Sequence, residues 1–156
     1  MNIVILGYRG TGKSTISRLL ARELDRKLVS LDELIVQSAG MPIPRIVSEF
    51  GWPKFREMEA KIVEAVAASE EDVVIDCGGG VVLNDNNTLL LRKNGKTILL
   101  TASFEAILKR IRRDPNRPPL KEGLSFEAEQ SQILAERQEK YLAVADITFD
   151  TTHDDP

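Results

Sequence analysis

The chain has 156 residues, of which 42% are hydrophobic and 29% are charged, values typical of one compact soluble domain rather than a disordered or membrane-embedded chain. Its net charge of −3 provides no general basic surface for nucleic acid or for a membrane. The single cysteine, Cys77, excludes an internal disulfide, and the single histidine, His153, argues against a Cys/His metal cage or a Ser-His-Asp triad. No signal sequence or long apolar run is present, so a cytoplasmic location is expected.

The hydrophobic pattern alternates between strand-like and helix-like segments within one domain, 1–156. The first segment, 2–6, is a short β-branched apolar run that stops at glycine, as in a strand buried on both faces. Strands that alternate with helices form right-handed βαβ units, which predicts an α/β fold with a parallel sheet. In chain order we expect a strand at 2–6, a helix at 14–24, a strand at 27–31, helices at 32–39, 43–50 and 53–66, a strand at 73–77, a short helix around 89–91, a strand at 97–100, helices at 103–111 and 125–144, and a strand at 146–149.

Two segments do not fit this alternation. Residues 114–123 contain three prolines among several charged residues, a composition typical of a surface loop. The last six residues, TTHDDP at 151–156, are polar, and we expect them to be frayed.

An anion-binding motif follows the first predicted strand. Residues 7–14, GYRGTGKS, match G-x-x-x-x-G-K-[ST] between a strand and a helix, the context that this motif requires. In such a loop, backbone N–H groups and the helix N-terminus bind phosphates, Lys13 reaches the β- and γ-phosphates, and the Ser14 hydroxyl can ligate Mg²⁺. A chance glycine-rich turn is the alternative, and the flanking elements argue against it. The sequence therefore predicts ATP binding by Gly10, Thr11, Gly12, Lys13, Ser14 and Thr15.

Other candidates lie where predicted strands end, because ligands of open α/β sheets bind beyond the carboxyl ends of the strands. Asp32 can orient or deprotonate a substrate hydroxyl, or it can cap the following helix. Asp76 is either an acid that holds magnesium through water or a surface acid that faces a helix. Gly78, Gly79 and Gly80 form a tight turn or allow close approach of a ligand, and a triplet favours the ligand.

Three arginines, Arg56, Arg117 and Arg137, complete the candidates. Singly, each is typical of a solvated surface. Together they favour a substrate with a carboxylate, which planar guanidinium groups bind in pairs of hydrogen bonds. An arginine on a loop can also stabilise the charge of a transferring phosphoryl group.

Six segments form a set that can be compared with known families. They are GYRGTGKST at 7–15, LDELI at 31–35, FREME at 55–59, CGGGVV at 77–82, NRPPL at 116–120 and RQEKYLAVAD at 137–146. Taken together and in this order, they resemble the shikimate kinase family. The resemblance implies a three-layer α/β/α P-loop fold of the nucleoside-monophosphate-kinase type, with a five-stranded parallel sheet in the order 2-3-1-4-5. It further implies ATP-dependent phosphorylation of the 3-hydroxyl of shikimate, a step of aromatic amino-acid biosynthesis, by a monomer.

The same resemblance implies roles for the candidate residues. Lys13 and Ser14 would serve ATP and Mg²⁺, and Asp32 would face the reacting hydroxyl as its base. The substrate-binding region would span about 32–60, and a mobile lid would span about 112–124. The remaining implied roles are a carboxylate clamp made by Arg56 and Arg137, support of that clamp by Glu59, backbone contacts from Gly78, Gly79 and Gly80, contact of Arg117 with both substrates, and a place beside the adenine for Arg110 or Arg113.

The chain departs from the family pattern at Ser30. The family usually carries two acids two residues apart after the second strand, and here only Asp32 is present. We hypothesise that Asp76 supplies the missing charge near the metal. Two alternatives stay open: a kinase of the same fold that acts on another hydroxylated acid such as gluconate, and a nucleotide-binding module without kinase activity, which Ser30 and the short segment after the last strand would explain.

Overall fold

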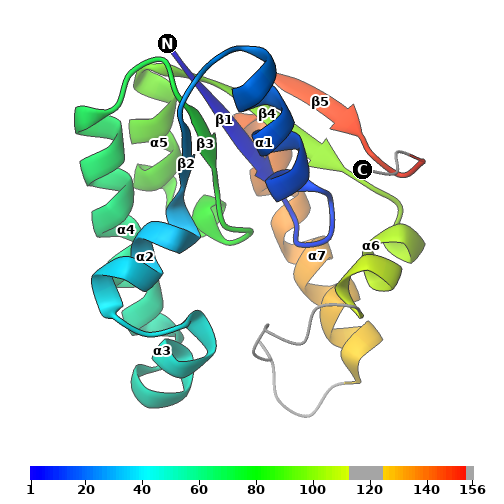
Figure 1. Ribbon diagram of the computed structural model, residues 1–156. Helices are drawn as coiled ribbons and strands as arrows, with labels where there is room; N and C mark the ends of the chain where they lie inside the picture. Colours follow the sequence, from blue (N-terminus) through cyan, green and yellow to red (C-terminus); the bar gives the residue numbers. More distant parts are fainter. Residues whose placement is uncertain (113–124, 154–156) are drawn as a thin grey trace.

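Five parallel strands form the centre of the protein (Figure 1). The computed structural model describes residues 1–112 and 125–153. The sheet order β2-β3-β1-β4-β5 confirms the order predicted from the family resemblance. The strands are β1 (Asn2–Gly7), β2 (Leu28–Ser30), β3 (Val74–Asp76), β4 (Gly95–Thr101) and β5 (Ile147–Asp150).

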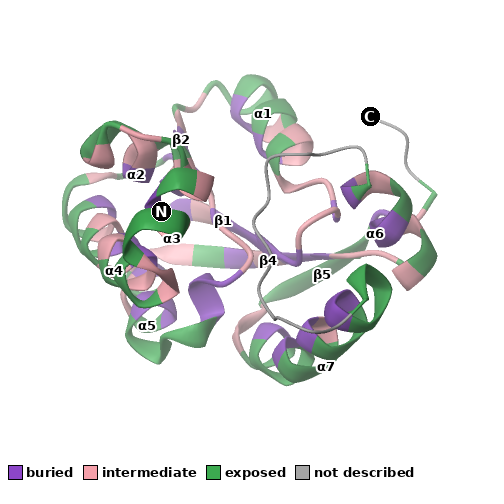
Figure 2. Ribbon diagram, turned by 90° about the horizontal axis from the view of Figure 1, so that it is seen from below, coloured by how far each residue is buried: buried purple, intermediate pink, exposed green. Residues whose placement is uncertain are grey.

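Helices cover both faces of the sheet, which gives the three predicted layers (Figure 2). In β1, Val4 and Leu6 point into one core cluster and Ile5 points into another, because alternate side chains of a strand face opposite ways. The first cluster receives side chains from α4, α5, α6 and α7, and the second receives them from α1. The helices are α1 (Lys13–Glu23), α2 (Leu31–Ala39), α3 (Ile43–Phe50), α4 (Trp52–Ser69), the 3-10 helix η1 (Val81–Leu83), α5 (Asp85–Lys93), α6 (Phe104–Ile111) and α7 (Phe126–Val144).

A third, smaller core holds the region beyond the end of β2. Ile35 of α2, Ile46 of α3 and Phe55 of α4 are buried against one another. Figure 1 shows α2 and α3 extending from the end of β2 (cyan). This packing fixes the start of α4 relative to the carboxyl ends of the strands, where the sequence predicts the site.

The structure differs from the predicted elements mainly between β3 and β4. The helix expected around 89–91 is the longer α5, because Asn84 caps it by accepting a hydrogen bond from the Asn86 N–H at 3.0 Å. The helix η1 was not predicted, and it forms because the N–H groups of Val81 and Leu83 donate to the carbonyls of Gly78 and Gly80. Within 1–112 and 125–153, no helix is long and apolar enough to span a membrane.

Candidate active site

The glycine-rich motif joins β1 to α1 and turns around one carbonyl oxygen. The Tyr8 carbonyl accepts from the Thr11 hydroxyl at 2.6 Å and from the Lys13 Nζ at 3.0 Å. Gly12 caps α1 with a φ of 93°, a left-handed conformation that costs little only for glycine. The lysine is therefore held across the loop, at the N-terminus of α1, where an anion is stabilised.

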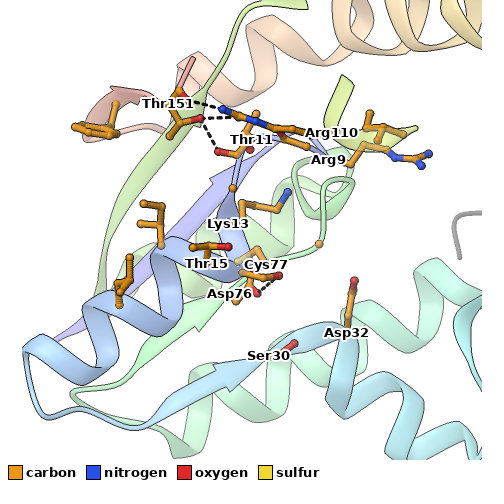
Figure 3. Close-up of a pocket in the computed structure, with 18 of the residues that line it drawn as sticks. Arg9, Thr11, Lys13, Thr15, Ser30, Asp32, Asp76, Cys77, Arg110 and Thr151 are labelled. Atoms are coloured by element: carbon orange, nitrogen blue, oxygen red, sulfur yellow. Dashed lines mark hydrogen bonds between the residues drawn. The ribbon is translucent and has the colours of Figure 1, made fainter. Parts of the chain in front are cut away.

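A cavity of about 810 Å³ opens beside this loop (Figure 3), a volume typical of sites for small molecules. It is lined by the predicted ATP-binding residues of the loop and by acids from the ends of β2 and β3. All six predicted loop contacts line it, namely Gly10, Thr11, Gly12, Lys13, Ser14 and Thr15, together with Asp32 and Asp76.

Asp76 lines this cavity beside the glycine-rich loop. The Ser14 hydroxyl donates to the Asp76 Oδ2 at 3.2 Å. Ser30, the position that lacks the family's first acid, is the direct register partner of Asp76 on the neighbouring strand. A carboxylate at position 76 is therefore displaced from position 30 by one strand spacing, about 4.8 Å.

Asp32 is not the helix cap. The cap of α2 is Ser30, whose hydroxyl accepts from the Glu33 N–H at 3.3 Å, and Asp32 follows inside the first turn. The capping interpretation of Asp32 is thus wrong, and its carboxylate is directed into the cavity (Figure 3). The reason is local, since the serine at the strand end satisfies the helix N-terminus and the aspartate is not needed as a cap.

A second, smaller pocket adjoins the large cavity. It holds about 50 Å³, and Arg9, Asp32 and Gly78 line both spaces. The second pocket also contains the predicted carboxylate clamp, Arg56 and Arg137, with Glu59 and the three glycines. Asp32 therefore lies at the junction between the phosphate-binding loop and the two arginines.

The glycine triplet lets charged side chains approach the main chain. A Cβ atom at Gly78 would lie 2.9 Å from the Asp32 Oδ1 and 3.2 Å from the Glu59 Oε2. A Cβ atom at Gly80 would lie 2.3 Å from both terminal nitrogens of Arg56. Larger residues at these two positions would displace the acid or the guanidinium from the pocket.

A buried ion pair orients Arg56. The Arg56 Nη1 donates to the Glu59 Oε1 at 3.1 Å, and Glu59 is only 1% exposed. Burial raises the pKa of Glu59, and the neighbouring Arg56 opposes this shift. The Arg56 guanidinium carbon also lies 5.3 Å from the centre of the Trp52 ring and 5.2 Å from that of Phe55. Arg56 is thus fixed by one carboxylate and two aromatic rings.

Arg137 comes from α7, on the other side of the glycine triplet at 78–80. It is only 8% exposed, and Tyr141, one helical turn later, donates its hydroxyl proton to the Gly79 carbonyl. Burial raises the pKa of Tyr141 to about 12, so the hydroxyl keeps this proton at neutral pH. Tyr141 was not among the predicted site residues, although its spacing of four residues from Arg137 places both on one helix face.

The structure does not test the predicted roles of Arg117, Arg113 and the lid, and it corrects the prediction of a frayed segment after the last strand. Arg117 and Arg113 lie outside the described residues, as does the predicted lid except for Arg112. Arg110 lines the large cavity and donates to the Gly10 carbonyl at 3.0 Å. The expectation of a frayed segment after the last strand is wrong for Thr151, which is 3% exposed and hydrogen bonded to the glycine-rich loop.

The chain matches a family model and many curated relatives. The family model described as shikimate kinase matches residues 9–156. The shikimate kinase of Geobacter metallireducens is 40% identical over 151 residues, which cover 97% of this chain and 83% of the relative. The shikimate kinase of Caldicellulosiruptor bescii is 48% identical over 122 residues, 78% of this chain and 70% of the relative.

Solved structures agree with this assignment. Shikimate kinase from Acinetobacter baumannii, solved in complex with shikimate, superposes with a TM-score of 0.90 at 31% identity and covers 97% of this chain and 84% of that structure. The Aquifex aeolicus enzyme gives 0.82 at 29% identity, with 100% and 89% covered. A gluconokinase from Sinorhizobium meliloti, 14% identical over 99% of this chain and 83% of its own, gives a TM-score of 0.52 and shares only the fold. The chain belongs to the shikimate kinase family.

Proposed function

We propose that this chain transfers the γ-phosphoryl group of ATP to the 3-hydroxyl of shikimate. The observation that carries the proposal is the position of Asp32 at the junction of two spaces, one lined by the glycine-rich loop and one by Arg56 and Arg137. Phosphoryl transfer requires this adjacency, because donor and acceptor must meet in line at one reacting atom. The chain's membership of the shikimate kinase family makes shikimate the expected acceptor.

At the donor end, the loop binds the phosphates of ATP. Lys13 already donates to an oxygen, the Tyr8 carbonyl, so a phosphate oxygen with a formal charge is a stronger acceptor for the same ammonium group. Backbone N–H groups from Gly10 to Thr15 and the N-terminus of α1 supply the other donors. As charge spreads over the transferring group, Lys13 stabilises it, and Arg117 is predicted to do the same.

At the acceptor end, two arginines bind the carboxylate of shikimate. Arg56 is fixed by Glu59 and the aromatic rings of Trp52 and Phe55, and Arg137 is buried on α7. Because both side chains are held in place before the substrate arrives, binding loses less conformational entropy. With the carboxylate held there, Asp32 orients the hydroxyl and accepts its proton while the new oxygen–phosphorus bond forms and the bond to ADP breaks.

Magnesium suits the oxygen donors at the other side of the cavity. Mg²⁺ is held by one or two carboxylates or hydroxyls together with substrate phosphates, and Ser14 and Asp76 offer such a pair. Among residues 1–112 and 125–153 no group of three His, Cys, Asp or Glu side chains is placed to hold a metal ion. When bound, Mg²⁺ neutralises charge on the phosphates. We assign its protein contacts to Ser14 directly and to Asp76, which takes over the role of the acid missing at Ser30.

Exchanging Ser30 and Asp76, which lie at the ends of neighbouring strands, tests the proposed magnesium contacts without any measurement of turnover. Magnesium should strengthen ADP binding to the wild-type chain, and Asp76→Asn should reduce that gain by about tenfold, as removal of outer metal contacts does elsewhere. The double change Ser30→Asp/Asp76→Ser should restore it. Calorimetric ADP titrations with magnesium and with a chelator measure the gain. An undiminished gain in Asp76→Asn would contradict the assignment.

ADP release tests the overall function. Wild-type chain is supplied with Mg-ATP and, separately, shikimate, gluconate, a nucleoside monophosphate or no acceptor. Arg56→Ala should lower kcat/KM for shikimate by about 10²-fold or more, and Asp32→Asn should lower kcat by about 10²–10⁴-fold. Arg45→Ala is the matched control, because Arg45 forms an exposed pair with Glu49 at 2.8 Å on α3 and should leave both constants unchanged.

The acceptors separate the remaining alternatives. Turnover with gluconate and not shikimate would favour the kinase of a different hydroxylated acid. ATP binding without turnover on any acceptor would favour the inactive nucleotide-binding module.

A further inference from the structure

The glycine-rich loop is held from outside by two residues far away in the chain. Arg110, near the end of α6, donates from Nη1 to the Gly10 carbonyl at 3.0 Å. Thr151, directly after β5, donates its hydroxyl proton to the Thr11 carbonyl at 2.7 Å. In the view of Figure 3 these two side chains meet Thr11 on one side, and Lys13 lies on the other. Two successive carbonyls of the loop are therefore bound by partners outside it.

The two outer residues also bind each other. The Arg110 Nη1 donates to the Thr151 hydroxyl oxygen at 3.1 Å, and Nη2 donates to the Thr151 carbonyl at 2.6 Å. The hydroxyl has one proton and two acceptors in reach, the Thr11 carbonyl at 2.7 Å and the Thr101 carbonyl at 3.2 Å, of which the Thr11 carbonyl is the nearer. It accepts from a guanidinium while it donates, an arrangement in which each hydrogen bond polarises and strengthens the next. Arginine carries several donors in one plane, and Arg110 reaches all three oxygens together.

The edge of the sheet fixes Thr151 in turn. The Thr151 N–H donates to the Thr101 carbonyl at 2.7 Å, which extends the pairing of β4 with β5 by one residue. The side chain is 3% exposed, so its hydroxyl is shielded from competing water. The end of the last strand is therefore a rigid point of attachment for the loop.

Because peptide groups are planar, these contacts to carbonyls also fix the directions of backbone N–H groups in the loop. In a trans peptide the carbonyl and the following N–H point in opposite directions. Binding of the Gly10 and Thr11 carbonyls by outer partners therefore sets the directions of the next two N–H groups. The Thr11 N–H donates to the Tyr8 carbonyl at 3.3 Å within the loop, so the group that these contacts orient for a phosphate is the Gly12 N–H. The flanking glycines take φ values of 80° and 93°, and glycine in a free loop can leave such conformations easily.

We propose that Thr151 is a positioning residue for nucleotide binding, which acts with Arg110 to hold the loop in its phosphate-binding conformation before ATP arrives. The proposal rests on the nucleotide-binding part of the proposed function. Loss of the Thr151 hydroxyl allows the loop more conformations, so binding must then order it. The affinity for the phosphates of a nucleotide falls as a result, whereas the two arginines that bind the shikimate carboxylate, Arg56 on α4 and Arg137 on α7, keep their positions.

Thr151→Val tests the proposal, since valine keeps the branched shape and removes only the hydroxyl. We expect the Kd for MgADP and the KM for ATP to rise about tenfold, equivalent to about 1.4 kcal/mol, while the KM for shikimate changes less than twofold. Thr151→Ser should restore both nucleotide constants. Thr148→Val is the matched control, because Thr148 is an exposed residue of the same strand, and it should bind MgADP as the wild type does.

A spectrum of the nucleotide-free chain separates loop positioning from a direct contact between Thr151 and the nucleotide. Amide nitrogen–hydrogen correlation spectra of Thr151→Val should show displaced or broadened signals from Gly10 and Gly12, and Thr151→Ser should return them. Unchanged loop signals, or an unchanged Kd for MgADP in Thr151→Val, would overturn the proposal. A wild-type chain that failed to bind MgADP would instead contradict the proposed function itself.

Discussion

Replacement of Gly80 by alanine offers a sharp test of the substrate pocket, because it perturbs one side chain and little else. Gly80 has φ −97° and ψ 8°, which alanine can adopt. The added Cβ atom would, however, lie 2.3 Å from Nη1 and Nη2 of Arg56, whereas ordinary contact begins at 3.4 Å. The guanidinium must therefore move by about 1 Å, away from the position in which Glu59 holds it at 3.1 Å.

The size of the effect follows from this displacement. An error of about 1 Å in the position of a binding group can reduce the rate about 10²-fold, equivalent to about 2.7 kcal/mol of transition-state stabilisation. The free energy of unfolding should change by less than about 1 kcal/mol, because the clashing atoms end a flexible side chain and can move. For a domain of this size, that limit corresponds to a change in Tm of roughly 2–4 °C.

Steady-state ADP release and thermal unfolding measure the two quantities. Gly80→Ala should lower kcat/KM for shikimate about 10²-fold and leave the Kd for MgADP and the Tm nearly unchanged. Gly40→Ala is the opposite control. Gly40 ends α2 with a φ of 69° and nothing within 4 Å of a Cβ atom, so alanine should lower the Tm through backbone strain of about 1–2 kcal/mol and leave kcat/KM unchanged. A folded Gly80→Ala chain with the kcat/KM of the wild type would refute the argued role of Arg56.

Two further predictions concern buried groups. Because the pKa of Tyr141 rises from about 10 when unfolded to about 12 when folded, the unfolded chain loses this proton first between pH 10 and 12, and the free energy of unfolding should fall by about 2.7 kcal/mol across that window. In urea titrations at pH 9 and 11, the free energy of unfolding of Tyr141→Phe should fall less than that of the wild type. An identical fall in both chains would contradict the prediction. Burial raises the pKa of the Cys77 thiol, which is 2% exposed, so mass spectrometry should detect alkylation on the order of 100-fold slower in the native than in the unfolded chain. Rapid native alkylation at pH 8 would show that the thiol is accessible.

The sequence alone determined the elements and the phosphate-binding loop. Strand and helix periods are local properties, and every strand expected from the apolar runs is present, with ends shifted by one or two residues. The loop at 7–14 is contiguous, so its glycines and Lys13 carry the necessary conformation and charge in one stretch of chain. The family resemblance predicted the sheet order and the function. The structure confirmed the first, and the comparisons confirmed the second.

Local patterns left the role of Asp32 open, because aspartate suits a helix cap as well as a reacting hydroxyl. The tertiary structure decided between them by showing Ser30 in the capping position and Asp32 in the cavity. Similarly, three glycines in a row predict close approach without saying of what. The fold answered this by bringing Arg56, Glu59 and Asp32 against them from two different helices.

Contacts between distant segments depended on the tertiary structure entirely. Ser14 meets Asp76 across 62 residues of sequence, and Thr151 meets Thr11 across 140. Such pairs depend on strand register and on which strand lies at which edge, and a shift of one residue would turn each side chain to the opposite face. Because these are properties of the assembled sheet, no local pattern of residue types encodes them, and a polar segment after the last strand gave no sign that its first threonine is buried against the nucleotide-binding loop.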